Sequence, residues 1–95
     1  MTNAPIVKNL RIFGRVQGVY YRAWCAQTAQ TMGLTGWVRN RKDGSVEALI
    51  IGDESRITRF ISSCYQGPKS AKVETITVTD SISPPVKGFD IRETY

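Results

Sequence analysis

Two glycines, Gly14 and Gly18, bracket a short loop between an apolar strand pattern and a helical pattern. Such a junction leaves several backbone N–H groups pointing at one spot, beside the positive end of a helix dipole. Arg22 falls in the first helical turn, where a cation is disfavoured by about 0.3–1 kcal/mol. An arginine set against the dipole indicates that an anion lies between them. The junction therefore predicts a phosphate cradle built without the lysine of a Walker loop.

The alternation of strand and helix patterns constrains the fold as a whole. The order β-α-β-β-α-β with a trailing strand predicts a ferredoxin-like α+β sandwich. In that arrangement two helices cover one face of an antiparallel sheet, and here a short extra strand ends the chain. The expected strands are residues 7–13, 34–41, 45–51, about 71–79 and 89–92. One helix is expected at about residues 21–32, and a second begins with the acidic and capping residues 53–55 and is stopped by Gly67-Pro68.

The same periodicity sorts the side chains into core and surface. Leu10 and Ile12 share one face of the first expected strand. The Asp43-Gly44 pair predicts a hairpin between the second and third strands, and residues 81–87, with two prolines, predict a loop. The apolar stripes of the two helices are Cys25, Ala29 and Met32, and Ile57, Phe60, Ile61 and Cys64.

Length and charge narrow the class of protein. Ninety-five residues with 41% apolar side chains are expected to form one domain, residues 1–95, in which residues 1–6 are flexible. The absence of a signal-peptide pattern and of an apolar stretch of membrane-spanning length favours a cytoplasmic protein without membrane contact. The net charge of +5 favours anionic partners, either small phosphates or nucleic acid.

The sequence contains no histidine, which removes Ser-His and Cys-His nucleophiles and the commonest metal ligand. Cys25 and Cys64 have no CxxC spacing and no ligand partners nearby, so neither a metal nor another cofactor is expected. A disulfide would require their Cα atoms to lie within about 7 Å, closer than the axes of packed helices. In a cytoplasmic chain we expect two buried free thiols.

The expected hairpin carries a second candidate site residue, Asn40. Strand alternation puts Asn40 on the same face as Val38 and opposite to Trp37. If Val38 faces the helices, Asn40 lies at the strand end on the helix side, near Arg22 and the glycine loop. An arginine, a ring of backbone donors and one amide then converge on a space of the size of an anion.

Each of these residues, taken singly, has a plainer interpretation. The glycines are typical of ordinary turns, an arginine such as Arg22 often forms a surface ion pair, and an asparagine such as Asn40 often caps the local backbone. Trp37 is expected to pack rather than to bind a ligand. The basic cluster is expected to be solvated surface; it consists of Arg39, Arg41 and Lys42. The joint pattern of loop, arginine and asparagine is what favours a functional site.

The two motifs together resemble those of the acylphosphatases. The motifs are Gly14-Arg15-Val16-Gln17-Gly18-Val19-Tyr20-Tyr21-Arg22 and the block Gly36–Glu47, and the element order is similar over nearly the whole chain. The resemblance implies metal-independent hydrolysis of small acyl phosphates to carboxylate and inorganic phosphate. It implies that Arg22 binds the phosphate and that Asn40 orients the attacking water. The implied phosphate-binding loop, acting through its backbone amides, is Arg15, Val16, Gln17, Gly18, Val19 and Tyr20.

The residues present suit that chemistry. A carboxylate is a good leaving group and needs no general acid. A loose phosphoryl-transfer transition state mainly requires positioning and stabilisation of charge on the phosphoryl oxygens. An arginine supplies this bidentately, which a lysine cannot do.

Two alternatives remain at this point. RNA-recognition modules share the β-α-β-β-α-β order, but they carry stacking aromatics on the third strand, and residues 45–51 contain none. Nucleic acid is therefore a less favoured partner than an acyl phosphate. The other alternative is a scaffold or ligand-sensing domain with a degenerate phosphate site, against which the presence of both Arg22 and Asn40 argues. We expect a monomer.

Overall fold

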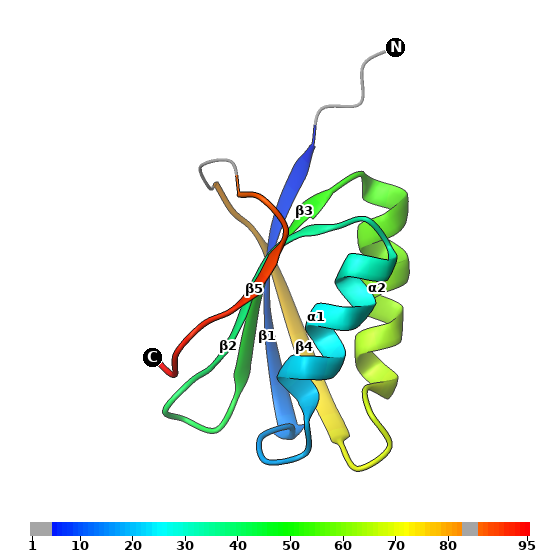
Figure 1. The fold of residues 1–95 in the computed structure, drawn as a ribbon. Coiled ribbons are helices and arrows are strands. Elements are labelled where there is room, and N and C mark those ends of the chain that lie inside the picture. The colour runs from blue at the N-terminus through cyan, green and yellow to red at the C-terminus, as the bar shows by residue number, and fades with distance from the viewer. Residues whose placement is uncertain (1–4, 83–85) are drawn as a thin grey trace.

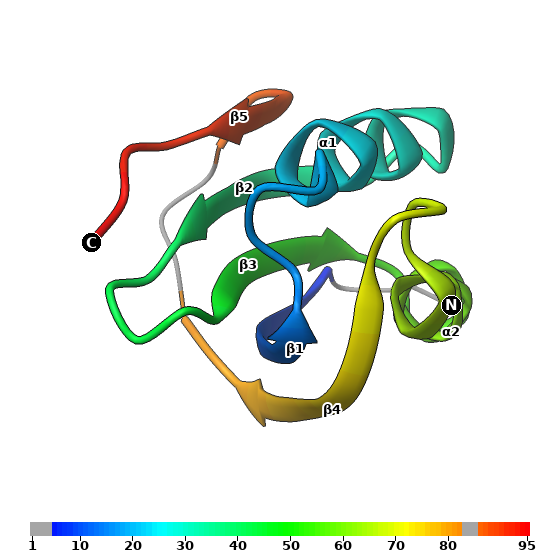
Figure 2. The same cartoon turned by 90° about the horizontal axis from the view of Figure 1, so that it is seen from below.

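Strand β1 (Ile6–Arg15) lies inside the sheet and pairs antiparallel with two partners that are distant in the sequence. The computed structural model describes residues 5–82 and 86–95 (Figure 1). The strand order is β4-β1-β3-β2-β5, and both helices cover one face of the sheet (Figure 2). The other elements are α1 (Tyr21–Thr31), β2 (Thr35–Asn40), β3 (Val46–Gly52), α2 (Glu54–Gln66), β4 (Lys72–Asp80) and β5 (Phe89–Ile91).

The ferredoxin-like sandwich predicted from the sequence is confirmed, and the described elements fall close to where the periodicity expects them. Strand β1 is longer than expected: it includes Ile6, which was expected to be flexible, and Gly14 and Arg15, which were expected in the loop, because they pair with β3 and β4. The four longer strands pair antiparallel. The short strand β5 adds to them in parallel beside β2, with Val38 opposite Ile91, so the sheet as a whole is mixed. Part of the expected loop, residues 83–85, and residues 1–4 of the expected flexible start lie outside the described residues.

The core lies between the sheet and the two helices. Leu10, Ile12 and Val38 are fully buried there, as the strand alternation predicts. The predicted stripe of helix α1 buries small side chains, whereas that of α2 contributes larger ones. The buried members of the two predicted stripes are Cys25 and Ala29 on α1 and Ile57, Phe60 and Cys64 on α2, with Met32 and Ile61 partly buried.

Cys25 and Cys64 are free and buried, as expected. The contact with Cys64 and its burial raise the pKa of the Cys25 thiol well above the ordinary value, so this thiol stays protonated and unreactive. Neither helix in the described part of the chain is long and apolar enough to cross a membrane.

Local signals explain where several elements begin and bend. Asp53 caps α2 by accepting a hydrogen bond from the backbone N–H of Arg56 at 2.8 Å. The register of β1 against β4 shifts between Phe13 and Gly14. Gly14 has a φ of 127°, and a Cβ there would overlap the backbone of β4. A glycine is therefore required at the bulge that turns the chain from the sheet into the loop.

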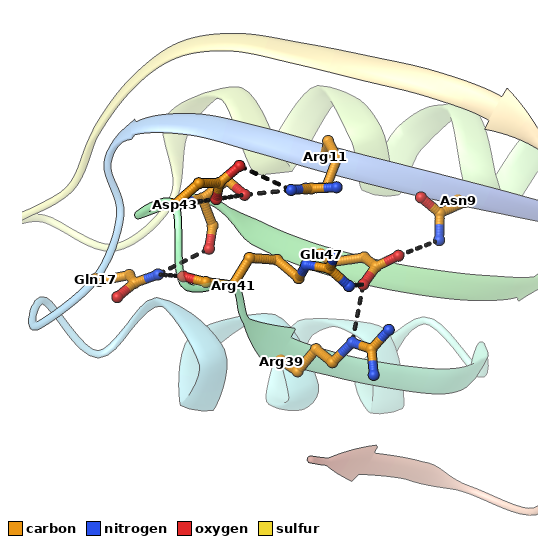
Figure 3. A network of polar contacts seen from close by, with 8 residues as sticks. Asn9, Arg11, Gln17, Arg39, Arg41, Asp43 and Glu47 are labelled. Carbon is orange, nitrogen blue, oxygen red and sulfur yellow. Dashed lines mark hydrogen bonds and ion pairs between the residues drawn. The ribbon is translucent and has the colours of Figure 1, made fainter. Parts of the chain in front are cut away.

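The open face of the sheet carries a network centred on Glu47 (Figure 3). One carboxylate oxygen of Glu47 accepts hydrogen bonds from Arg39 at 2.8 Å and Arg41 at 3.0 Å. The other oxygen accepts one from Asn9 at 3.0 Å. The Arg39 guanidinium also lies 4.6 Å from the ring centre of Trp37. The expectation of a solvated basic cluster is therefore wrong for both arginines, because Glu47 and the aromatic rings hold them against the sheet.

This network predicts an acid-sensitive contribution to stability. Burial alone would raise the pKa of Glu47, but the hydrogen bonds from Asn9 and Arg39 and the charges of Arg39 and Arg41 lower it overall. A carboxyl group with a lowered pKa in the folded state stabilises the fold above its unfolded pKa, about 4.3, and that stabilisation is lost as the pH falls through the folded value. Urea denaturation should therefore find Glu47→Gln less stable than the parent at pH 7, with the gap closing below about pH 4.

The matched control is Glu74→Gln, which changes an exposed glutamate outside this network. A gap for Glu47→Gln that stays constant from pH 7 to pH 3 would contradict the assignment of the gap to the Glu47 ion pairs.

Candidate anion-binding site

A hollow of about 420 Å³ opens at the N-terminal end of α1. It is within the usual size range of small-molecule sites, roughly 300–1,000 Å³. Its walls come from the loop after β1, from the first turn of α1, from the end of β2 and from β5. The lining residues are Val16, Gly18, Tyr20, Tyr21, Arg22, Ala23, Asn40 and Ile91.

The loop presents unpaired backbone donors to this end of the helix. In the described parts of the chain, the backbone N–H groups of residues 17–20 make no backbone hydrogen bond, and no side chain caps α1. Gly18 has a φ of 74° and Tyr20 a φ of 65°. Left-handed residues among right-handed ones turn successive N–H groups toward one point, which forms an anion-binding concavity. The free N–H groups of the first turn of α1 add to it.

Arg22 is the cation of the hollow. It is partly buried, and no acidic residue occupies the first turn of α1. None of the ion pairs formed within residues 5–82 and 86–95 includes Arg22, whereas Arg11, Arg39, Arg41 and Arg56 each have a carboxylate partner. A guanidinium without a counter-ion, placed beside free N–H groups, makes a strongly anion-attracting site.

Asn40 reaches the same hollow from the sheet. Val38 is in the core beneath the helices, so strand alternation turns Asn40 to the helix side, as predicted. The side-chain oxygen of Asn40 is buried and has no hydrogen-bond partner. Leaving a buried acceptor unsatisfied costs about 1–3 kcal/mol. A water or ligand donor in the hollow would remove that cost.

Gln17 ties the loop to the hairpin that carries Asn40. Its side-chain amide donates to the carbonyl oxygens of Arg41 and Ser45, both at 2.8 Å (Figure 3). These two residues also close the hairpin, through a 2.8 Å bond from the Arg41 N–H to the Ser45 carbonyl. The side chain of Gln17 therefore fixes the spacing between the loop amides and the end of β2. Sequence reasoning considered only the backbone of Gln17, because nothing local indicates a bond across 24 residues.

Tyr21 holds the first turn of α1 in place. Its ring is 1% exposed, and its hydroxyl donates to the Cys64 carbonyl of α2 at 2.7 Å. Burial raises the pKa of this phenol, which keeps it a hydrogen-bond donor. Arg22 is the next residue along the chain, so the position of the Tyr21 ring fixes the backbone from which the guanidinium extends.

The structure brings together most, but not all, of the residues predicted from the sequence. Arg22, Asn40, Val16, Gly18 and Tyr20 line the hollow. The other three predicted residues do not: the side chain of Arg15 is exposed, that of Val19 is in the core and that of Gln17 contacts the hairpin. Tyr21, Ala23 and Ile91 line the hollow without having been predicted. Ile91 could not be found from its sequence position, because only the parallel pairing of β5 brings it beside β2.

Known proteins match both the sequence and the fold. The family model for acylphosphatase matches residues 8–91. An acylphosphatase of Rhodopseudomonas palustris is 53% identical over 73 residues, covering 77% of this chain and 74% of the relative. One of Azoarcus sp. is 53% identical over 81 residues, covering 85% of this chain and 83% of the relative.

Solved structures agree with these relatives. The acylphosphatase of Bacillus subtilis superposes with a TM-score of 0.87 at 36% identity, over 92% of this chain and 98% of that one. That of Coxiella burnetii gives a TM-score of 0.89 at 27% identity, over 94% of both chains. Because the family model spans nearly the whole chain and these relatives are identical to it at about half of the aligned positions, this protein belongs to the acylphosphatase family.

Proposed function

We propose that this protein hydrolyses the carboxyl–phosphate anhydride of small acyl phosphates, releasing a carboxylate and inorganic phosphate. Family membership supports the reaction class. The observation that carries the proposal is the pairing of two unsatisfied groups in one hollow. The Arg22 guanidinium has no carboxylate partner among the described residues, and the Asn40 oxygen has no hydrogen-bond donor.

In this mechanism Arg22 and the loop amides bind the phosphoryl group. The phosphoryl oxygens carry negative charge in the substrate and in the transition state. The free backbone N–H groups of residues 17–20 donate to these oxygens, and the guanidinium of Arg22 donates bidentately. The loop is fixed by Gln17 and the first turn by Tyr21, so few groups need to reorganise as the reaction proceeds.

Asn40 orients the nucleophile. Its side-chain oxygen accepts a hydrogen bond from a water that attacks phosphorus in line with the leaving group. As the bond from water to phosphorus forms, the bond from phosphorus to the acyl oxygen breaks, and the electron pair leaves on the carboxylate. A phosphoryl oxygen takes up the proton of the water. No histidine and no general acid is required, because a carboxylate leaves without protonation.

We further propose that the reaction needs no metal ion or other cofactor. The sequence has no histidine. Within the part of the chain that the structure describes, no three or more cysteine, aspartate or glutamate side chains gather into a metal-binding group. Arg22 and the backbone amides supply the positive charge that a metal provides in many phosphoryl-transfer sites.

An RNA-binding role is not favoured. The open face of β3 presents Glu47 and Leu49, which are 9% and 4% exposed. Neither stacks on a base, and Arg39 and Arg41 on the same face are already paired with Glu47.

For the biological form we propose a single domain of residues 1–95 that acts as a cytoplasmic monomer. The loop, Arg22 and Asn40 already converge within a single copy of the chain, so the proposed site needs no partner subunit. The free thiols of Cys25 and Cys64 suit a reducing compartment.

The first test is turnover in the presence of EDTA. The purified protein should release phosphate from acetyl phosphate and benzoyl phosphate at neutral pH, with inorganic phosphate as a competitive inhibitor. Phosphate monoesters should react poorly, because an alkoxide leaving group needs a general acid that this hollow lacks. Inertness toward both acyl phosphates, or activity that EDTA abolishes, would contradict the proposed reaction.

The second test separates the roles of Arg22 and Asn40. Arg22→Ala should weaken inhibition by phosphate as well as turnover, because the guanidinium contacts the phosphoryl group in substrate and transition state alike. Asn40→Ala should lower kcat about 10²–10³-fold while leaving phosphate inhibition nearly unchanged, since the water bond strengthens only during attack.

Arg59→Ala is the matched control, because Arg59 is exposed on α2 and outside the hollow. Circular dichroism should confirm that all three variants fold. If Asn40→Ala loses phosphate inhibition but retains kcat, then Asn40 anchors the phosphate and does not orient the water.

A further inference from the structure

Tyr20 combines a left-handed backbone with an exposed ring. Its φ of 65° makes it the one residue other than glycine with a positive φ among residues 5–82 and 86–95. Glycine and asparagine adopt this conformation far more readily than tyrosine. The Tyr20 side chain is 84% exposed, so packing in the core does not offset the strain. The left-handed backbone belongs to the anion-binding loop, but core packing does not explain why a tyrosine, rather than a glycine or asparagine, occupies this position, and this points to a role for its side chain.

Tyr20 lines the hollow that contains Arg22 and Asn40. The described residues include six large apolar side chains that are strongly exposed, and two of them, Tyr20 and Ile91, line this hollow. The other four lie elsewhere; they are Tyr65, Val78, Ile82 and Tyr95. Surface exposure of apolar side chains is ordinary, but two around one pocket mark a site for an apolar ligand group.

Ile91 comes to the hollow from the opposite end of the chain. It pairs with Val38 in the parallel ladder between β2 and β5, two residues before Asn40 along β2. The side chain of Ile91 is 51% exposed. Figure 2 shows β5 lying beside α1, so the hollow has the helix start on one side and β5 on the other.

We infer that Tyr20 and Ile91 bind the acyl group of the substrate and make the enzyme selective for acyl phosphates with an apolar, preferably aromatic, acyl group. This inference rests on the proposed function, because Arg22 and the loop amides must hold the phosphoryl end. The acyl carbon is joined to that end through one oxygen, so the acyl group must occupy the neighbouring part of the hollow. Arg22 is the single charged side chain that lines it, and the rest of the lining includes Val16, Ala23, Tyr20 and Ile91.

Two substrates and matched variants test this assignment. Tyr20→Asn removes the ring but keeps a residue that tolerates the left-handed backbone, whereas Tyr20→Phe keeps the ring. Ile91→Ser replaces the apolar side chain on the other side of the hollow with a small polar one. For benzoyl phosphate, Tyr20→Asn and Ile91→Ser should each raise KM about tenfold, which corresponds to about 1.4 kcal/mol of binding. For acetyl phosphate the change should be less than twofold.

The controls separate acyl binding from a structural role. Ile82→Ser, which changes an exposed isoleucine outside the hollow, is the control that should leave both substrates unaffected, whereas Tyr20→Phe, which keeps the ring, should keep the preference for benzoyl phosphate over acetyl phosphate. Inhibition by inorganic phosphate should be the same in all variants. The melting temperature of Tyr20→Asn should equal or exceed that of the parent, because the variant relieves backbone strain.

A binding measurement keeps this inference separate from the proposed reaction. In benzoylphosphonate and acetylphosphonate the labile bridging oxygen is absent, and the acyl carbon is bonded directly to phosphorus. The parent should bind benzoylphosphonate more tightly, and Tyr20→Asn should bind the two with similar affinity. That result would support the acyl site even if neither acyl phosphate were hydrolysed, an outcome that would overturn the proposed reaction alone. The assignment of Tyr20 and Ile91 would be overturned if the variants weakened binding equally for both substrates or for both phosphonates. It would also be overturned if they did not weaken binding at all.

Discussion

Burial of the Tyr21 ring is the contact on which the site depends. The other buried side chains of helix α1, those of Cys25, Ala26 and Ala29, are small and do little to fix where the helix starts. Tyr21 supplies a large ring in the first turn and a hydroxyl bonded to α2. With the first turn held against α2, the chain must connect β1 to α1 through residues 16–20, and Tyr20 adopts its left-handed backbone in that short connection.

The sequence predicted the fold and the centre of the site because the relevant signals are local. Strand and helix periodicity located the elements, and the alternation that buries Val38 also turned Asn40 toward Arg22. These features depend on spacing along one strand or one turn. Once the elements were placed in the ferredoxin-like order, the guanidinium of Arg22 and the amide of Asn40 were predicted to meet at one end of the sheet.

What the sequence could not predict depends on contacts between distant segments. The two bonds from Gln17 to the hairpin join residues more than 20 positions apart, and no local pattern distinguishes Gln17 from a solvent-exposed glutamine. The arginines of the hairpin were predicted to be solvated because their partner, Glu47, lies on the next strand. Ile91 reaches the hollow because β5 pairs in parallel with β2 through three residue pairs. The sequence of such a short terminal segment does not indicate which strand it pairs with.

The position of β1 in the sheet also has a consequence for how the chain folds. β1 is synthesised first, yet its partners are β3 and β4, and Lys8 pairs with Asp80 near the other end of the chain. Contacts between segments so far apart in sequence require large loops to close, which slows folding. On the ribosome, β1 lacks its second partner strand until β4 has emerged, so the loop that follows β1 starts from an incomplete sheet. The candidate anion site, although most of its lining comes from the first half of the sequence, is therefore expected to form late, when almost the whole chain is available.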